Sequence, residues 1–165
     1  LRLEAELLTG DGTTGHFTGI TQTSGIVAQP HVTDLLTTIR TGLATLERTG
    51  YEPSAIVLSS ADWMRLDLLS VSSGSTDVRG LPINQAERRI WGTRVVLSEG
   101  LGSKVGLIIG ADSVTVDLDG RGIDLEWSAE HSGQFTKNEV IARAEMRAGV
   151  SVSQPAAVVK LATSA

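Results

Sequence analysis

"QFTKNEVIARAEMRAGVSVSQPAAVVKL" (residues 134–161) alternates apolar and polar side chains for longer than an ordinary strand requires. Every second residue from Val140 to Val152 is apolar, whereas the residues between them are mostly charged or polar. Residues such as Glu145 favour an α-helix by intrinsic propensity. The period of two residues nevertheless predicts a β-strand. At ~3.3 Å per residue we expect a continuous strand of about 50 Å, well beyond the usual length. One compact domain cannot easily cover such a strand, so we expect a neighbouring molecule, or a further part of the protein, to cover it.

The preceding segment, "GIDLEWSAE" (residues 122–130), alternates in the same way. "HSGQ" (residues 131–134) then supplies residues that favour a turn. The two alternating segments therefore predict a long antiparallel hairpin with one apolar and one polar face. The apolar face of the first strand is formed by Ile123, Leu125, Trp127 and Ala129, and its polar face by Asp124, Glu126, Ser128 and Glu130.

The charges of this hairpin are divided between its strands. The first strand is acidic and the return strand is basic, and two interpretations remain open. The charges form cross-strand pairs on a solvated face, worth a few tenths to ~1 kcal/mol each, or they also meet a neighbouring subunit and set its register. The acidic residues are Asp124, Glu126 and Glu130, and the basic residues are Lys137, Arg143 and Arg147.

The middle of the chain predicts helices and short strands. Residues 32–50 have helical spacing, with Thr33 as the expected N-cap and Gly50 as the left-handed residue that ends the helix. A second helix is expected to begin after Ser59, which with Asp62 resembles a capping box. A polar, Gly/Ser-rich mobile loop is expected at residues 71–89. Short strands are expected at residues 54–58, 93–98, 104–110 and 113–119.

Composition excludes several classes of function. The chain has 165 residues, no cysteine and a formal net charge of −5. Disulfides and thiolate metal sites are therefore absent, and the acidic balance argues against a broadly basic nucleic-acid-binding surface. No apolar stretch is long enough to span a bilayer. We expect no specific nucleic-acid binding, no membrane association and no cofactor.

The short motifs give little support to an active site. "GDGTTG" (residues 10–15) fits the G-x-G-x-x-G pattern, but that fingerprint requires a preceding strand and a following helix. A helix is expected before it, so we interpret it as a loop. His16, His31 and His131 lack partners at metal-ligand spacing, and no G-x-S-x-G elbow marks a nucleophile. We expect neither a metal site nor an enzyme.

The order of these segments resembles the major capsid proteins of tailed bacteriophages, the family with the Hong Kong phage capsid fold. Four stretches carry the likeness, which covers nearly the whole chain. Arg94 stands where the family often has proline, and Ala111 and Asp112 where it often has Asp-Phe. The stretches are "LEAELLTGDGTTGHFTGI", "AIVLSSADWMRLDLL", "IWGTRVVLSEGL" with "VGLIIGADSVTVDLDG", and the C-terminal run quoted above.

The resemblance implies an α+β fold, with an axial domain of mixed sheet flanked by helices and a long β-hairpin of the peripheral domain. It places the end of a spine helix and a Gly-rich exit loop at residues 1–24. The axial domain falls at 25–117, the peripheral hairpin at 118–154, and the closing strand and tail at 155–165. The loop at 71–89 is expected near the capsomer axis with Asp77, Arg79 and Arg88.

The implied function is a structural subunit of an icosahedral phage or prophage capsid, self-assembling around packaged DNA. Pentamers and hexamers, a scaffolding protein or protease, and assembly in the bacterial cytoplasm follow from the same resemblance. "LRLEAELL" (residues 1–8) begins as an uncapped helix, so we expect the chain to be the C-terminal part of a longer protein that does not close into shells alone. The alternatives are an encapsulin-type compartment shell and a small α/β enzyme that uses the loop at residues 10–15.

The resemblance also suggests interface and crosslinking residues. Some members form an isopeptide bond between a Lys and an Asn, for which a buried Glu takes the lysine proton. Asn138 and Glu145 stand at the corresponding positions, and the donor Lys would lie in an extended loop outside this chain. The expected subunit-interface residues are Glu126, Trp127, Lys137, Arg143, Glu145 and Arg147.

Overall fold

The computed structural model describes residues 2–72, 83–84, 87–128, 137 and 140–164. The chain divides into two compact units, Leu1–Thr115 together with Val150–Ala165, and Val116–Gly149. Among the described residues, no helix is long and apolar enough to cross a membrane.

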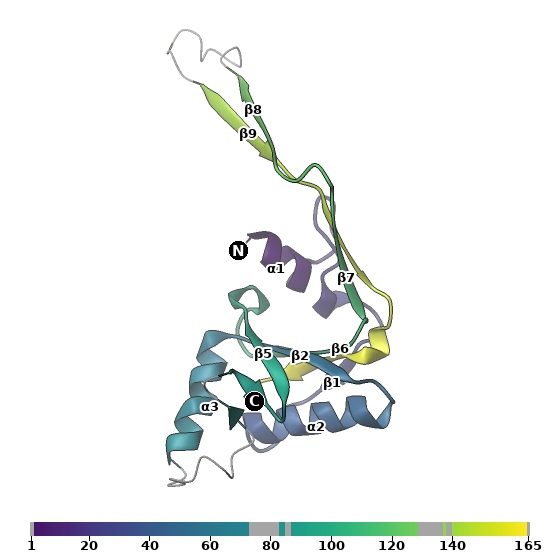
Figure 1. The fold of residues 1–165 in the computed structure, drawn as a ribbon, viewed down its shortest axis with the longest axis vertical. Helices are drawn as coiled ribbons and strands as arrows, with labels where there is room; N and C mark the ends of the chain where they lie inside the picture. Colours follow the sequence, from purple (N-terminus) through teal and green to yellow (C-terminus); the bar gives the residue numbers. More distant parts are fainter. Residues whose placement is uncertain (1, 73–82, 85–86, 129–136, 138–139, 165) are drawn as a thin grey trace. The chain divides into compact units, whose positions relative to one another are not determined.

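The first unit is built on a mixed sheet of seven strands among the described residues, in the order β1-β11-β6-β2-β5-β4-β3 (Figure 1). The pairs β1–β11 and β2–β5 are parallel, and the other pairs are antiparallel. The closing strand predicted within residues 155–165 is β11, which lies inside the sheet between β1 and β6. The strands are β1 Val27–Gln29, β2 Pro53–Leu58, β3 Ile83–Asn84, β4 Arg89–Ile90, β5 Thr93–Leu97, β6 Val105–Gly110 and β11 Val158–Ala162.

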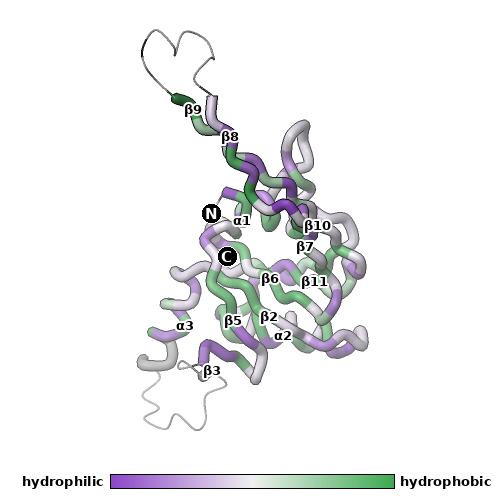
Figure 2. The backbone as a smooth tube through the Cα atoms, turned by 45° about the horizontal axis from the view of Figure 1, so that its top comes forward, coloured by the Kyte–Doolittle hydropathy of each residue, from purple (hydrophilic) through white to green (hydrophobic). Residues whose placement is uncertain are grey.

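The central strands place apolar side chains on both faces, because both faces of the sheet are covered. Ile56 and Leu58 of β2 pack with α2 (Leu35–Arg48) and α3 (Ser60–Ser72). Val57 points to the other face, toward Leu8 of α1 (Arg2–Thr9). That face is also covered by η1 (Ile20–Gln22) and η3 (Glu99–Leu101). Figure 2 shows the apolar residues following β2 and β6 through the sheet.

The N-cap of α2 lies one residue later than predicted. Asp34, not Thr33, is the N-cap, and its Oδ1 accepts the backbone N–H of Thr37 at 2.7 Å. The extended backbone of Asp34 (φ −149°) places its carboxylate beside that N–H, and a second carboxylate oxygen accepts the Thr37 hydroxyl at 2.9 Å. At the other end, the prediction for Gly50 is confirmed, because its φ is +85°.

Replacing Asp34 with alanine is expected to lower the free energy of unfolding by ~1 kcal/mol, because an orphan N–H loses its acceptor. Asp34→Asn retains most of that stability.

The pKa of the Asp34 carboxyl lies below its ordinary value of 3.8, chiefly because the Thr37 N–H donates to it. The cap therefore stabilises the fold above this ordinary value, and its contribution is lost as the pH falls through the lowered pKa. Urea unfolding at several pH values measures this. An equal loss in Thr33→Ala would contradict the assignment.

The second predicted helix is confirmed, with a modified capping box. The Ser59 hydroxyl accepts the Asp62 N–H at 3.2 Å and donates to the Asp62 carboxylate at 3.0 Å. In a full capping box, the acidic side chain reaches the backbone N–H of the cap residue. The aspartate here meets the hydroxyl instead, and Ser59 and Asp62 are both buried.

The loop predicted at residues 71–89 is only partly correct. The helix α3 continues to Ser72, and strands form at Ile83–Asn84 and from Arg89 onward. Residues 73–82 and 85–86 lie outside the described residues. The strands β4 and β5 are joined by Trp91 and Gly92, with φ of 47° and 80°. Two left-handed residues between paired strands are typical of a type I′ hairpin turn, which polar loop composition does not reveal.

The long continuous strand predicted from Val140 to Val152 is wrong. The run forms β9 (Ile141–Glu145) and β10 (Ala148–Val152), which pair with β8 (Asp124–Ser128) and β7 (Val114–Leu118), respectively. The partner strands β7 and β8 are separated by a turn in which the Gly122 N–H donates to the Asp119 carbonyl at 3.0 Å. Because the ladder changes partner here, Met146 and Arg147 leave the strand. The predicted turn at residues 131–134 lies outside the described residues.

Candidate subunit interface

The β8–β9 ribbon, residues 124–128 paired with 141–145, has the predicted apolar and polar faces. Leu125 lies opposite Ala144, and Trp127 lies opposite Ala142. These four residues share one face, since alternate residues of a strand point the same way. The other face carries the charged residues Asp124, Glu126, Arg143 and Glu145, with Ser128 and Ile141.

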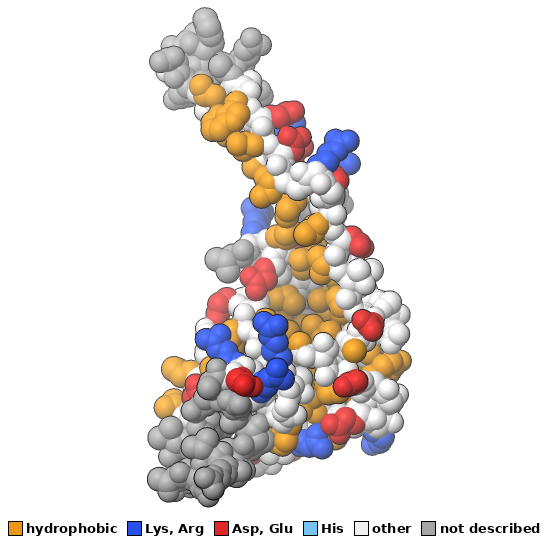
Figure 3. Space-filling model, viewed as in Figure 1, with side chains coloured by type: hydrophobic (Ala, Val, Ile, Leu, Met, Phe, Trp, Pro, Cys, Tyr) orange, Lys and Arg blue, Asp and Glu red, His pale blue; other side chains and the backbone are white. Residues whose placement is uncertain are grey.

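The apolar face of this ribbon is uncovered. Trp127 is 66% exposed and Leu125 is 50% exposed, and no described residue from Val116 to Gly149 is buried. Figure 3 shows hydrophobic side chains following the ribbon on its visible face. A two-stranded ribbon without a covered face is marginally stable in water, and contiguous exposed apolar surface marks an interaction site. The ribbon therefore has the properties of a surface that another chain covers.

The polar face contains a small ion-pair network. Arg143 Nη2 lies 2.7 Å from Glu126 Oε2 on the opposite strand, and Arg143 Nε lies 3.4 Å from Glu145 Oε1. All three side chains are about 60% exposed or more, so each pair contributes only a few tenths of a kcal/mol to ~1 kcal/mol. The predicted cross-strand ion pairing therefore occurs within the single chain, between Arg143 and Glu126. Pairs this weak leave the same side chains available to contact a neighbouring subunit.

The structure describes only some of the other predicted site residues. Lys137 and Arg147 are exposed and make no side-chain ion pair within the described part of the chain. The Arg147 carbonyl accepts the Asp119 N–H at 3.0 Å. Arg88 is exposed beside β4, with a φ of 48°. Asp77, Arg79 and Asn138 lie outside the described residues.

The single chain does not provide the environment that crosslinking requires. The Glu145 side chain is 60% exposed and is paired with Arg143. A carboxylate that takes a proton from lysine works best when burial raises its pKa. Covering by a neighbouring subunit, or by a further part of the protein, would supply that burial.

The Gly-rich loop after α1 is held by close backbone packing. Its Gly10 N–H donates to the Glu6 carbonyl at 2.9 Å, and the Gly19 N–H donates to the Gly10 carbonyl at 2.9 Å. A Cβ on Gly10 would lie 2.4 Å from the Phe17 carbonyl oxygen. Packing therefore requires glycine at position 10. A helix rather than a strand precedes Gly10, so the dinucleotide fingerprint fails here.

Two further polar features lie outside the ribbon. His16 Nδ1 lies 2.8 Å from Glu6 Oε1 in the Gly-rich loop. Among the described residues, no group of three or more acidic, histidine or cysteine side chains is arranged to hold a metal ion. The Asp11 carboxyl has a pKa below its ordinary value, chiefly because the Thr13 N–H donates to it. These contacts order the loop itself.

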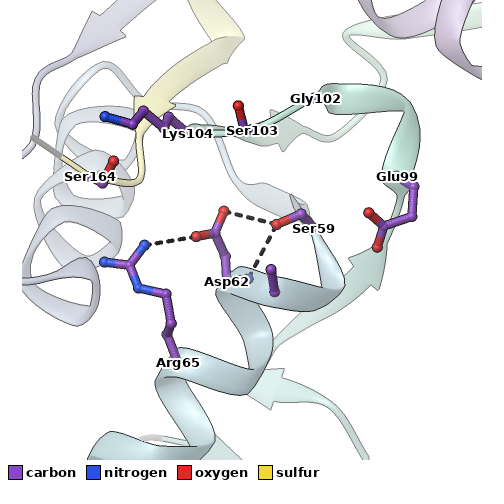
Figure 4. Close-up of a pocket in the computed structure, with 9 residues that line it drawn as sticks. Ser59, Asp62, Arg65, Glu99, Gly102, Ser103, Lys104 and Ser164 are labelled. Carbon is purple, nitrogen blue, oxygen red and sulfur yellow. Dashed lines mark hydrogen bonds and ion pairs between the residues drawn. The ribbon is translucent and has the colours of Figure 1, made fainter.

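Sequence reasoning missed a polar depression at the start of α3 (Figure 4). Asp62 Oδ1 accepts Arg65 Nη1 at 3.0 Å, and the same guanidinium nitrogen donates to the Thr163 carbonyl at 3.2 Å. The pKa of Glu99 is lowered, chiefly by the hydroxyl of Ser60 and also by its N–H. The charged side chains that line this depression already have partners within the chain. The contact of Arg65 with Thr163 links α3 to the residue that follows β11.

A comparison with protein-family models matches the phage capsid family over residues 1–163. The comparison with curated proteins finds no match. Because the family match spans nearly the whole chain, the chain belongs to the phage capsid family. It is a structural head subunit of a virion capsid, a non-enzymatic protein that assembles into a shell with copies of itself. The predicted resemblance is confirmed, and the family favours the phage head over the compartment shell and the small enzyme.

Proposed function

We propose that the β8–β9 ribbon is the peripheral-domain hairpin of the Hong Kong phage capsid fold and contacts neighbouring subunits through its apolar face. The exposed Trp127 and Leu125 carry this proposal. The interface that we propose also includes Glu126, Arg143 and Glu145 on the polar face of the same ribbon, together with Lys137 and Arg147 outside its two strands. The axial domain is then residues 25–117, and the peripheral domain is residues 118–154.

The same proposal extends to the arrangement of subunits. Subunits form pentamers and hexamers, with the segment at residues 71–89 directed toward the capsomer axis. The exposed position of Arg88 beside β4 supports this placement of the segment. A scaffolding protein or protease assists assembly in the bacterial cytoplasm. The acidic net charge of −5 suits an inner wall that does not hold packaged DNA tightly.

The experiment that tests this function is negative-stain electron microscopy of the protein expressed as its gene encodes it, with any scaffolding partner supplied. We expect uniform hollow shells and a fast-sedimenting species. A well-folded product that stays small at high concentration would overturn the proposal.

We expect shells of this protein to dissociate into monomers on a boiled denaturing gel. The reason is that Glu145 is solvated and paired with Arg143, so the lysine proton lacks a buried acceptor. The gel is run on assembled and unassembled protein. A ladder of covalent multimers that disappears in Glu145→Gln, but persists in Glu126→Gln, would show that the neighbouring subunit completes a crosslinking site.

A further inference from the structure

Two arginines lie directly opposite each other on one side of the sheet. Arg89 of β4 is the cross-strand partner of Arg94 of β5, and both are exposed. Like charges in this position destabilise a strand pair. Arg89 is compensated by Glu87 at 3.2 Å and by the Gly92 carbonyl at 2.9 Å. Arg94 makes no side-chain hydrogen bond or ion pair within the described residues. We call Arg89 and Arg94 the basic rung.

The β8–β9 ribbon carries the opposite arrangement. Asp124 of β8 is the cross-strand partner of Glu145 of β9, and both are exposed. Arg143 pairs with Glu145 and with Glu126, whereas Asp124 makes no ion pair within the described part of the chain. The polar face therefore holds three carboxylates and one guanidinium. We call Asp124 and Glu145 the acidic rung.

The two rungs match in geometry as well as in charge. Each joins directly opposed residues of an antiparallel pair, in which the two Cα atoms lie about 4.5 Å or about 5.5 Å apart, depending on whether the pair exchanges backbone hydrogen bonds. Two guanidinium groups at such a spacing can meet two carboxylates at a similar spacing, and guanidinium–carboxylate pairs form strong, oriented hydrogen bonds. Each rung thus carries a repulsion that the other relieves.

We propose that the acidic rung of one copy of this chain lies against the basic rung of a neighbouring copy in the shell. This inference rests on the proposed function, because it requires the assembled homo-oligomer. Copies with a net charge of −5 repel one another in general, so local complementarity of this kind selects orientation and register. An extended polyanion is a poorer match for the basic rung, because Glu87 lies beside Arg89 at 3.2 Å.

The test is a set of charge reversals in the protein as its gene encodes it. Arg89→Glu with Arg94→Glu reverses the basic rung, and Asp124→Arg with Glu145→Arg reverses the acidic rung. Each double variant is expected to lower the yield of shells about tenfold or more. A chain that carries all four substitutions is expected to recover most of that yield. Shell yield is measured by sedimentation and microscopy, and folding by thermal unfolding of the unassembled protein.

Matched controls separate this contact from general charge effects. Arg121→Glu and Asp117→Arg reverse exposed charges outside both rungs and are expected to leave the yield unchanged. Asp124→Asn removes the like-charge repulsion, so it is expected to lower assembly while the unassembled chain melts at the same or a higher temperature. A purely structural role of Asp124 would lower both.

The outcomes distinguish this inference from the proposed function. Wild-type shells, with both reversed doubles assembling as well as the wild type, would overturn the rung contact and leave the ribbon interface intact. Failure of the fourfold variant to recover assembly would also overturn the contact. Loss of DNA retention in shells that form normally would assign the basic rung to nucleic acid instead. Absence of shells from the wild type would overturn the proposed function itself.

Discussion

Replacing Trp127 with alanine is expected to abolish shell assembly while the chain still folds. The side chain is 66% exposed in the single chain, so its removal leaves no cavity in the core. Covering the exposed part of a tryptophan in an interface stabilises the contact by roughly 2–4 kcal/mol. A loss of ~3 kcal/mol weakens a contact by roughly a hundredfold, and the loss recurs in every subunit of a closed shell.

The measurement combines negative-stain microscopy with thermal unfolding of the unassembled protein. Trp127→Phe is the conservative control and is expected to retain shells, because an aromatic side chain still fills the contact. Trp63→Ala provides the contrast. Trp63 is only 8% exposed in the core, so this variant is expected to lose ~3–5 kcal/mol of stability. Normal shells from Trp127→Ala would show that the apolar face of the ribbon is not the interface.

Replacing Gly19 with alanine is expected to destabilise the fold by ~1–3 kcal/mol or more. A Cβ at this position would lie 2.5 Å from the Gly10 nitrogen, 2.7 Å from the Thr9 nitrogen and 2.8 Å from the Leu8 carbonyl carbon. All three are backbone atoms, so no side chain can rotate away to make room. The last turn of α1 would have to move, and overpacking of this kind costs ~1–3 kcal/mol or more.

The matched control for this variant is Gly120→Ala. Gly120 has open space around its Cβ position and no left-handed φ, so alanine there is expected to change stability by less than ~1 kcal/mol. Chemical denaturation of the two variants measures the difference. Equal unfolding midpoints would mean that the Gly-rich loop is not packed against the end of α1.

The local pattern of side chains was sufficient to predict many of the helices and strands of this protein. Alternation along residues 122–130 predicted the apolar and polar faces of β8, because the side chains of a strand point alternately to its two faces. The apolar run at residues 54–58 predicted a strand, and the spacing within residues 32–50 predicted the helix α2. The order of such segments along the chain was enough by itself to suggest the capsid family.

The alternation also predicted the antiparallel pairing of β8 with β9, but only the tertiary structure decided how the seven-stranded sheet is ordered and where each pairing ends. The sequence from Val140 to Val152 keeps one period, but β9 and β10 have different partners because a turn at Asp119–Gly122 separates β8 from β7. The choice of Asp34 over Thr33 as the cap depended on which side chain reached the Thr37 N–H. The polar contacts of Arg65 with Thr163, and the two like-charged rungs, join residues whose proximity depends on strand register. Periodicity along one segment sets the faces of an element, whereas register depends on segments far away in the chain.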